Sequence, residues 1–333
     1  MAIPFIALSA ITPSLLLMWY FHSRDVYPEP PRVLWTTFGL GVLSVIPVML
    51  VALPAARLLG GVSNAYLRGM QNAFLIAAVP EEFFKFLVLV LYCARHREFN
   101  EPMDGVIYGV SASLGFATLE NSLYVAKGGI SIAILRALTA VPCHAFLGAI
   151  MGYYVGQAHF NLRQPRVLLL FGAWAVPTLL HGLYDFPLLT LQSMTSGTHD
   201  AVGAGPLVSS GLVLLTLLVL IFEGEWAVWA VRRLRAIQQP HSVAVAQAAK
   251  GRSVWGWVFS LLGGLLATGG GLVTLGLGMS LALGHVEAED LAATLIGGMV
   301  LGILPLVVGL MLFVAGIRRL NQRPAPMTPA YQG

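Results

Sequence analysis

Charged residues are scarce in this sequence, and their scarcity limits the class of protein. Asp, Glu, Lys and Arg make up 10% of the 333 residues, and 57% of the residues are hydrophobic. Soluble domains usually contain roughly 25% charged residues, so a soluble globular protein is excluded and an integral membrane protein is indicated. The net charge of +4 requires no nucleic-acid partner, because cytoplasmic loops that lie on anionic lipid account for it.

Cysteines, alternating strands and internal repeats are also lacking. The two cysteines, Cys93 and Cys143, have no metal-type spacing, so we expect them to be small buried hydrophobic residues. A membrane β-barrel would need segments of about ten residues with alternating polarity, whereas the apolar runs here are longer and continuous. No period of 20–50 residues is visible, which excludes a repeat protein.

Nine apolar runs are long enough to cross a bilayer, since each crossing takes around 20 residues. The first run has no basic leader and no small-residue cleavage site, so we expect a retained helix and not a signal peptide. The predicted fold class is an all-α, polytopic transmembrane helix bundle of about nine helices. The predicted helices span residues 3–21, 33–55, 70–94, 105–127, 130–158, 167–192, 206–231, 254–284 and 291–317.

Basic residues mark one side of the predicted bundle. Fourteen of the 19 Lys and Arg residues fall on loops of the same side, which predicts an N-terminus outside and a C-terminus in the cytoplasm. A shift to polar composition between the seventh and eighth predicted helices divides the chain into a core (1–235), a polar cytoplasmic linker (236–252), a C-terminal transmembrane hairpin (253–320) and a flexible tail (321–333).

Ionisable residues inside the apolar runs are concentrated in four consecutive predicted helices. Each charged side chain placed in lipid costs at least about 2.5–3.5 kcal/mol on insertion scales, so a shared polar interior is expected. The residues are Glu81, Glu82 and Lys85 in the third helix, Glu120 and Asn121 in the fourth, Arg136 and His144 in the fifth, and His181 and Asp185 in the sixth.

The depth of these residues in the membrane indicates that their side chains meet. At about 1.5 Å per residue, four of them lie roughly 10–21 Å below the outer boundary: Glu81, Glu120, His144 and His181. Lys85 follows the two glutamates at i+4 and i+3, so one carboxylate pairs with it while the other faces the cavity. The alternative is a buried salt bridge that only fixes helix packing.

The histidines have competing interpretations. His181 and Asp185 share a helix face at i, i+4, so Asp185 is expected to orient the imidazole. A lone intramembrane histidine such as His144 is usually a packing residue, but its depth favours a place in the site. Arg136 lies near the outer end of its predicted helix, and we expect it to extend toward the membrane surface.

Carboxylates and imidazoles held out of bulk water suit one kind of chemistry. A glutamate there can take a proton from water as a general base, while neighbouring groups stabilise the oxyanion of an attacked carbonyl. A serine nucleophile is not indicated, because no Gly-x-Ser-x-Gly turn is present. Cys143 is next to His144 in sequence but lies on a different helix face, so attack by activated water is the simpler hypothesis.

Five short motifs in order resemble the PrsW intramembrane proteases, relatives of the CAAX-prenyl endopeptidase and Abi superfamily. They are "DVYPEPP", "EEFFK", "EPMDGVIYGVSASLGFATLENSLY", "HAFLGAIMGYYVGQA" and "HGLYDF". The resemblance covers roughly the first seven predicted helices. It implies six catalytic residues, namely Glu81, Glu82, Glu120, His144, His181 and Asp185, with supporting roles for Lys85, Asn121 and Phe116, where Phe116 opens the F-x-x-x-E pattern that Glu120 closes.

The resemblance also implies a function and a location. We expect a multi-pass protein of the bacterial cytoplasmic membrane that cleaves a single-pass membrane protein such as an anti-sigma factor, with the lipid bilayer as its other partner. A metal-free mechanism is favoured because no HExxH pair is present and surplus carboxylates can serve as base. The alternatives are a zinc enzyme, with His144, His181 and either Glu81 or Glu120 as ligands, and a proton-coupled transporter, which would need an inverted repeat that we do not see.

Overall fold

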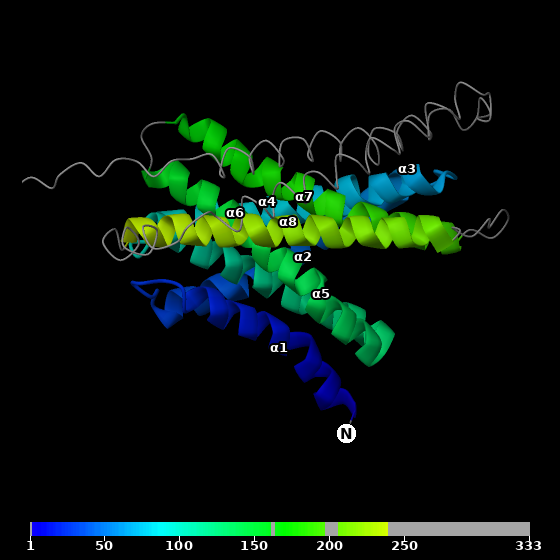
Figure 1. Cartoon of the computed structure of the whole chain (residues 1–333), viewed down its shortest axis with the longest axis horizontal. Coiled ribbons are helices and arrows are strands. Elements are labelled where there is room, and N and C mark those ends of the chain that lie inside the picture. The colour runs from blue at the N-terminus through cyan, green and yellow to red at the C-terminus, as the bar shows by residue number, and fades with distance from the viewer. Residues whose placement is uncertain (1, 161–163, 197–205, 239–333) are drawn as a thin grey trace, which may run out of the picture. The chain divides into compact units, whose positions relative to one another are not determined.

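The computed structural model describes residues 2–160, 164–196 and 206–238, and every regular element in these ranges is helical (Figure 1). The predicted C-terminal hairpin, the tail and most of the predicted linker lie outside the described residues. The elements are α1 (Ala2–His22), α2 (Pro31–Leu58), α3 (Ala65–Met70), the π-helix η1 (Gln71–Ala78), α4 (Val79–Leu91), the 3-10 turn η2 (Cys93–Arg95), α5 (Pro102–Leu138), α6 (Ala140–Phe160), α7 (Arg166–Ser196) and α8 (Pro206–Gln238).

Four helical stretches among the described residues are long and apolar enough to cross a membrane. They are Pro31–Leu58, Pro102–Phe160, Arg166–Met194 and Val208–Gln238. The all-helical class and the apolar character are therefore confirmed. The count of nine helices and the orientation of the termini stay predictions.

The third predicted helix is one continuous helical segment with an irregular middle. It passes from α3 through the π-helical turns of η1 into α4, and Pro80 lies at the start of α4. Proline has no N–H to donate and its ring crowds the preceding turn, which explains why the helix widens just before it. Wide π turns are frequent at functional sites. Here they come directly before Glu81 and Glu82.

The predicted boundary between the fourth and fifth helices lies where the chain turns. Gly129, inside the range of α5, has a φ of 66° and a ψ of −157°, so α5 consists of two helical pieces joined at a kink. Glycine adopts positive φ at little cost, which allows a turn at this position without a longer loop. Arg136 lies in the second piece, after the kink and before α6, the helix of His144.

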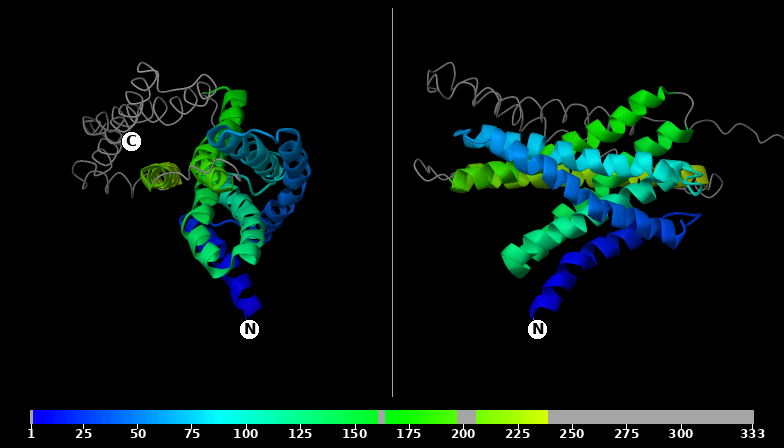
Figure 2. Two further views of the ribbon diagram at one scale, coloured as in Figure 1. Left: turned by 90° about the vertical axis from the view of Figure 1, so that its right-hand side faces the viewer. Right: turned by 180° about the vertical axis from the view of Figure 1, so that it is seen from behind.

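Glycines bring α5 and α6 into close contact at the centre of the bundle. A Cβ atom added at Gly109 or Gly152 would collide with the backbone of the facing helix, at Gly148 and Gly105 respectively. Small residues facing one another allow such backbone approach in membrane helices. On the flanks of this pair, α1 and α2 pack against α5, while α7 and α8 pack against α6 (Figure 2).

Candidate active site

The centre of the site is a buried carboxylate that links α4 to α7. Oε1 of Glu82 accepts a hydrogen bond from Nζ of Lys85 at 2.8 Å and another from Nδ1 of His181 at 2.8 Å. The side chains of Glu82 and Lys85 are both completely buried. Nζ of Lys85 also lies 4.2 Å from the centroid of the Phe116 ring, and this cation–π contact further stabilises the ammonium charge. Glu82 is therefore the structural anchor of the glutamate pair.

His144 joins the lysine to the next carboxylate. Its Nδ1 lies 3.1 Å from Nζ of Lys85, and its Nε2 lies 3.0 Å from Oε2 of Glu120. Because an ammonium group can only donate and a carboxylate can only accept, Nδ1 is the acceptor and Nε2–H is the donor. This assignment follows from the network of partners, and it describes a neutral imidazole of defined orientation.

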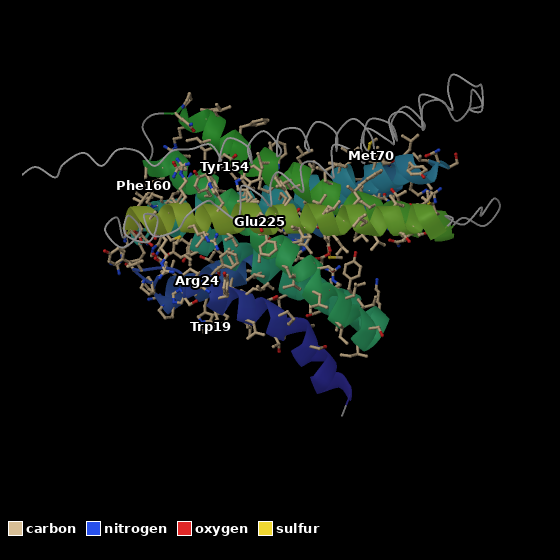
Figure 3. All side chains as sticks on the ribbon, viewed as in Figure 1. Trp19, Arg24, Met70, Tyr154, Phe160 and Glu225 are labelled. Carbon is tan, nitrogen blue, oxygen red and sulfur yellow. The ribbon has the colours of Figure 1, made fainter. Side chains whose placement is uncertain are left out.

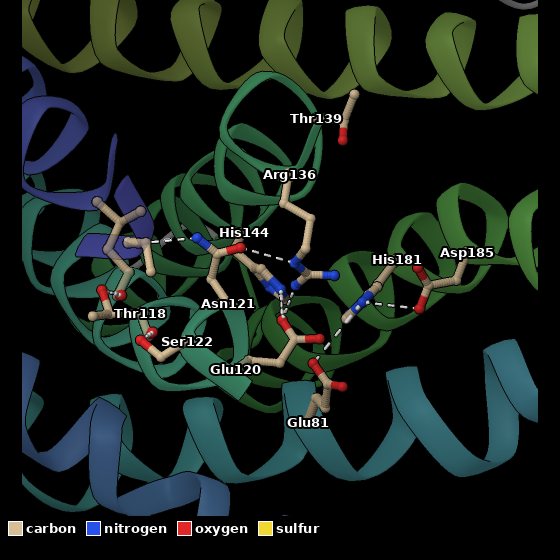
Figure 4. A network of polar contacts seen from close by, with 12 residues as sticks. Glu81, Thr118, Glu120, Asn121, Ser122, Arg136, Thr139, His144, His181 and Asp185 are labelled. Atoms are coloured by element: carbon tan, nitrogen blue, oxygen red, sulfur yellow. Dashed lines mark hydrogen bonds and ion pairs between the residues drawn. The ribbon is translucent and has the colours of Figure 1, made fainter. Parts of the chain in front are cut away.

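Glu120 also holds Arg136, contrary to the prediction that Arg136 extends to the membrane surface. Nη2 of Arg136 donates to Oε2 of Glu120 at 2.7 Å, and its Nε donates to Oδ1 of Asn121 at 3.0 Å (Figure 4). The prediction was wrong because the bend at Gly129 returns the chain toward Glu120, and a carboxylate in a low-dielectric interior attracts the guanidinium strongly. Asn121 in turn donates to the carbonyl of Ala10, which ties α5 to α1.

Glu81 is held much more loosely than Glu82. Its Oε2 is 3.9 Å from Nε2 of His181 (Figure 4). The same oxygen is 3.4 Å from Nζ of Lys85. Asp185 lies on the other side of the histidine, with Oδ2 3.4 Å from Nε2. Both ring nitrogens of His181 thus face carboxylate oxygens, an arrangement that an imidazolium satisfies because both nitrogens then donate.

The site is open on one side. The side chain of Glu81 is 11% exposed, that of Glu120 is 19% exposed and that of Asp185 is 22% exposed, whereas Glu82 and Lys85 have no exposed side-chain surface. Part of the surface of Glu81 is therefore accessible from outside the protein, whereas Glu82 is completely enclosed.

Residues 29–222, more than half of the chain, match the sequence profile of the PrsW family intramembrane metalloproteases, and this range includes all six predicted catalytic residues. The chain belongs to the PrsW family. It is therefore a membrane-embedded peptidase, which replaces the transporter alternative.

Named relatives give the same assignment. The chain is 40% identical to Protease PrsW of Bacillus subtilis (strain 168) over 186 residues, which cover 56% of this chain and 83% of the relative. It is 40% identical to Protease PrsW of Geobacillus kaustophilus over 185 residues, 55% of this chain and 80% of the relative. It is 32% identical to Protease PrsW of Clostridioides difficile over 187 residues, 55% of this chain and 78% of the relative. No solved structure matches the chain.

The family description names a metal, and the residues present fit one. Glu81, Glu82, His144 and His181 each offer a ligand atom, and these atoms lie within 4.8 Å of one another. Two imidazoles and two carboxylates are a donor set that zinc accepts. The set contains His144, His181 and Glu81, one of the two predicted versions, and adds Glu82; the alternative ligand Glu120 is not part of it. Within the described part of the chain Oε2 of Glu82 is buried without a hydrogen-bond partner, which leaves an oxygen available for such a role.

One buried acid near the site was missed at the sequence level. Glu223 on α8 is completely buried, and its carboxyl group lies against the thiol of Cys143, next to His144. Two carboxylates in the apolar run of the seventh predicted helix, Glu223 and Glu225, were the available signal. Both cysteines are buried and free, as predicted. The structure brings all nine predicted site residues together, while their catalytic and supporting roles stay predictions.

Proposed function

We propose that the protein is an intramembrane endopeptidase in which Glu81 activates the attacking water. One observation carries this choice between the two glutamates: Glu82 is fully buried and bonded to both Lys85 and His181, whereas Glu81 is partly exposed and has no contact shorter than 3.4 Å among the described residues. A general base needs a free lone pair within reach of water. Both glutamates keep an oxygen with a free lone pair, but only the side chain of Glu81 is partly exposed.

The reaction follows from the neighbours of Glu81. Glu81 takes a proton from water, and the water oxygen forms a bond to the scissile carbonyl carbon. The negative charge that develops on the carbonyl oxygen is stabilised by an N–H donor of the site, for which we propose His181, whose Nε2 lies 3.9 Å from Oε2 of Glu81. When the C–N bond breaks, Glu81 returns its proton to the leaving amine, and the products are a carboxylic acid and a free amine.

The surrounding residues keep this arrangement in place. Lys85 contacts both glutamates and His144, so it offsets carboxylate charge in the interior. Because Lys85 already supplies a cation to three of the four metal-ligand candidates, we favour base catalysis without a metal. If zinc is bound, Glu81, Glu82, His144 and His181 hold it, and it supplies a Lewis acid for water or carbonyl activation.

The proposed substrate is a single-pass membrane protein, with an anti-sigma factor as the expected type, cleaved in the bacterial cytoplasmic membrane. Comparative membrane proteomics of a deletion strain would identify a single-pass protein that persists uncleaved. Reconstitution of that protein with the enzyme in proteoliposomes then tests the mechanism. Full cleavage by the Glu81→Gln variant would refute the proposed base.

A further inference from the structure

A basic pocket of about 180 Å³ lies between the end of α1 and the last turns of α8, away from the glutamate site. Three arginines line it: Arg24, Arg232 and Arg235. Its apolar wall includes Phe21 and Val231, both buried. Figure 3 shows Arg24 at the end of α1 next to α8. The pocket therefore combines a cationic rim with an apolar wall.

The positive charge of this pocket has no carboxylate partner at two of its three arginines. Neither Arg24 nor Arg235 forms an ion pair with any acid in the described ranges. The guanidinium of Arg24 lies 4.5 Å from the centroid of the Tyr20 ring. The acid next to it in sequence, Asp25, instead accepts hydrogen bonds from Gln238 at 2.8 Å and from the backbone N–H of Tyr27 at 3.1 Å. No acid among the described residues therefore neutralises the charge of these two arginines.

Apolar surface leads from the pocket along both helices. Leu16 lies one turn before Tyr20 on α1, and Ile221 lies two turns before Val228 on α8, so each continues the helix face that borders the pocket. Leu16 is 60% exposed and Ile221 is 48% exposed. A ligand with an anionic head and long hydrocarbon chains matches this sequence of surfaces.

We propose that the pocket binds the headgroup phosphate of an anionic phospholipid, with the acyl chains lying along α1 and α8. Guanidinium groups bind phosphate oxygens through paired N–H donors. Basic pockets between transmembrane helices on the cytoplasmic side are typical sites for anionic lipid headgroups, and the basic-residue pattern predicts that this end faces the cytoplasm. Free phosphate would use the arginines but gain nothing from the exposed apolar faces.

Native mass spectrometry of the purified full-length protein tests the proposal, with phosphatidylglycerol and phosphatidylcholine of the same acyl chains as probes. Each arginine near an anionic headgroup contributes about 1 kcal/mol, so the Arg24→Gln/Arg235→Gln variant should bind phosphatidylglycerol roughly thirtyfold more weakly. The matched control is Arg95→Gln/Arg97→Gln, which removes two exposed arginines on the same predicted side. Its binding should stay within about threefold of the wild type.

Three outcomes would overturn the proposal. The first is equal affinity of the wild-type protein for phosphatidylglycerol and phosphatidylcholine, a measurement that needs no variant to fold. The second is an equal effect of the pocket variant and its control. The third is displacement of phosphatidylglycerol by inorganic phosphate at the same concentration, which would indicate a free-anion site. Melting temperatures of both variants verify that loss of lipid is not loss of fold.

Discussion

Replacing Glu82 with Gln should destabilise the folded protein far more than the same change at Glu81. Oε1 of Glu82 holds Lys85 and His181, each at 2.8 Å. In the variant the Lys85 ammonium stays buried, and the carboxylate left near it on α4 is that of Glu81, at the longer distance of 3.4 Å. Removing one partner of a buried ion pair costs about 3–5 kcal/mol. At roughly 2–4 °C per kcal/mol, the melting temperature should fall by about 6–20 °C.

Glu81→Gln is the matched control, because it makes the same chemical change one residue away. Its contacts are 3.4 and 3.9 Å long, against 2.8 Å for those of Glu82, so the loss of stability should be well below that of Glu82→Gln. Cleavage should nevertheless fall by about 10²–10⁴-fold, the usual contribution of a general base. The measurements are thermal unfolding of the purified protein at pH 7 and cleavage in proteoliposomes.

A double variant separates lost pairing from general damage. Glu82→Gln/Lys85→Met removes both charges, and replacing a buried pair with groups of similar volume is often neutral, so at least half of the lost melting temperature should return. Equal destabilisation by Glu81→Gln and Glu82→Gln would refute the division between anchor and base. A double variant no more stable than Glu82→Gln alone would refute the assignment of Lys85 as the stranded charge.

Three further predictions follow from other parts of the molecule. Arg136→Lys should reduce the cleavage rate by roughly tenfold with little change in melting temperature, because one ammonium cannot reproduce the two directed contacts to Glu120 and Asn121; an unchanged rate would contradict this. Burial raises the pKa of Glu29 to about 9, with help from neighbouring Asp104 and against the hydrogen bond from Tyr108. The folded protein therefore keeps a proton that the unfolded chain loses near pH 4.5, so the unfolding free energy should fall as pH rises from about 5 to 9, and Glu29→Gln should remove that slope in melting temperature. For the metal, base catalysis predicts full cleavage after chelation with less than one zinc per chain by elemental analysis; loss of cleavage that added zinc restores would establish the zinc mechanism instead.

The common polar interior could be predicted from the sequence because burying charge in lipid is expensive. Residues such as Glu81, His144 and His181 bear that cost only if they share a protected space, and simple depth counting places them at one level. The contacts between Lys85 and the glutamates follow from i+3 and i+4 spacing within one helix. These features depend on helical periodicity and on depth in the membrane, and both can be calculated from the positions of the residues in the sequence.

The missed features depend on where the chain turns. The pairing of Arg136 with Glu120 requires the chain to turn back at Gly129, and hydropathy gives the position of such a turn but not the side chains that it brings together. The π turns before Pro80 adjust which way the glutamates point, which an ideal helical wheel does not contain. Glu223 was detectable, since a carboxylate in an apolar run is itself a sign of a polar neighbour, but nothing in the sequence places it beside Cys143.

The adjacent glutamates explain how a single helix turn supplies both a scaffold and a reactive group. Consecutive residues point about 100° apart on a helix, so Glu82 faces the interior partners while Glu81 faces the open side. Loss of either should abolish cleavage, but for different reasons: Glu82 because Lys85 and His181 lose the oxygen that positions them, Glu81 because water loses its base. Activity alone cannot separate these causes. To separate the two causes, stability and cleavage must both be measured for each variant, because only Glu82→Gln should lower both.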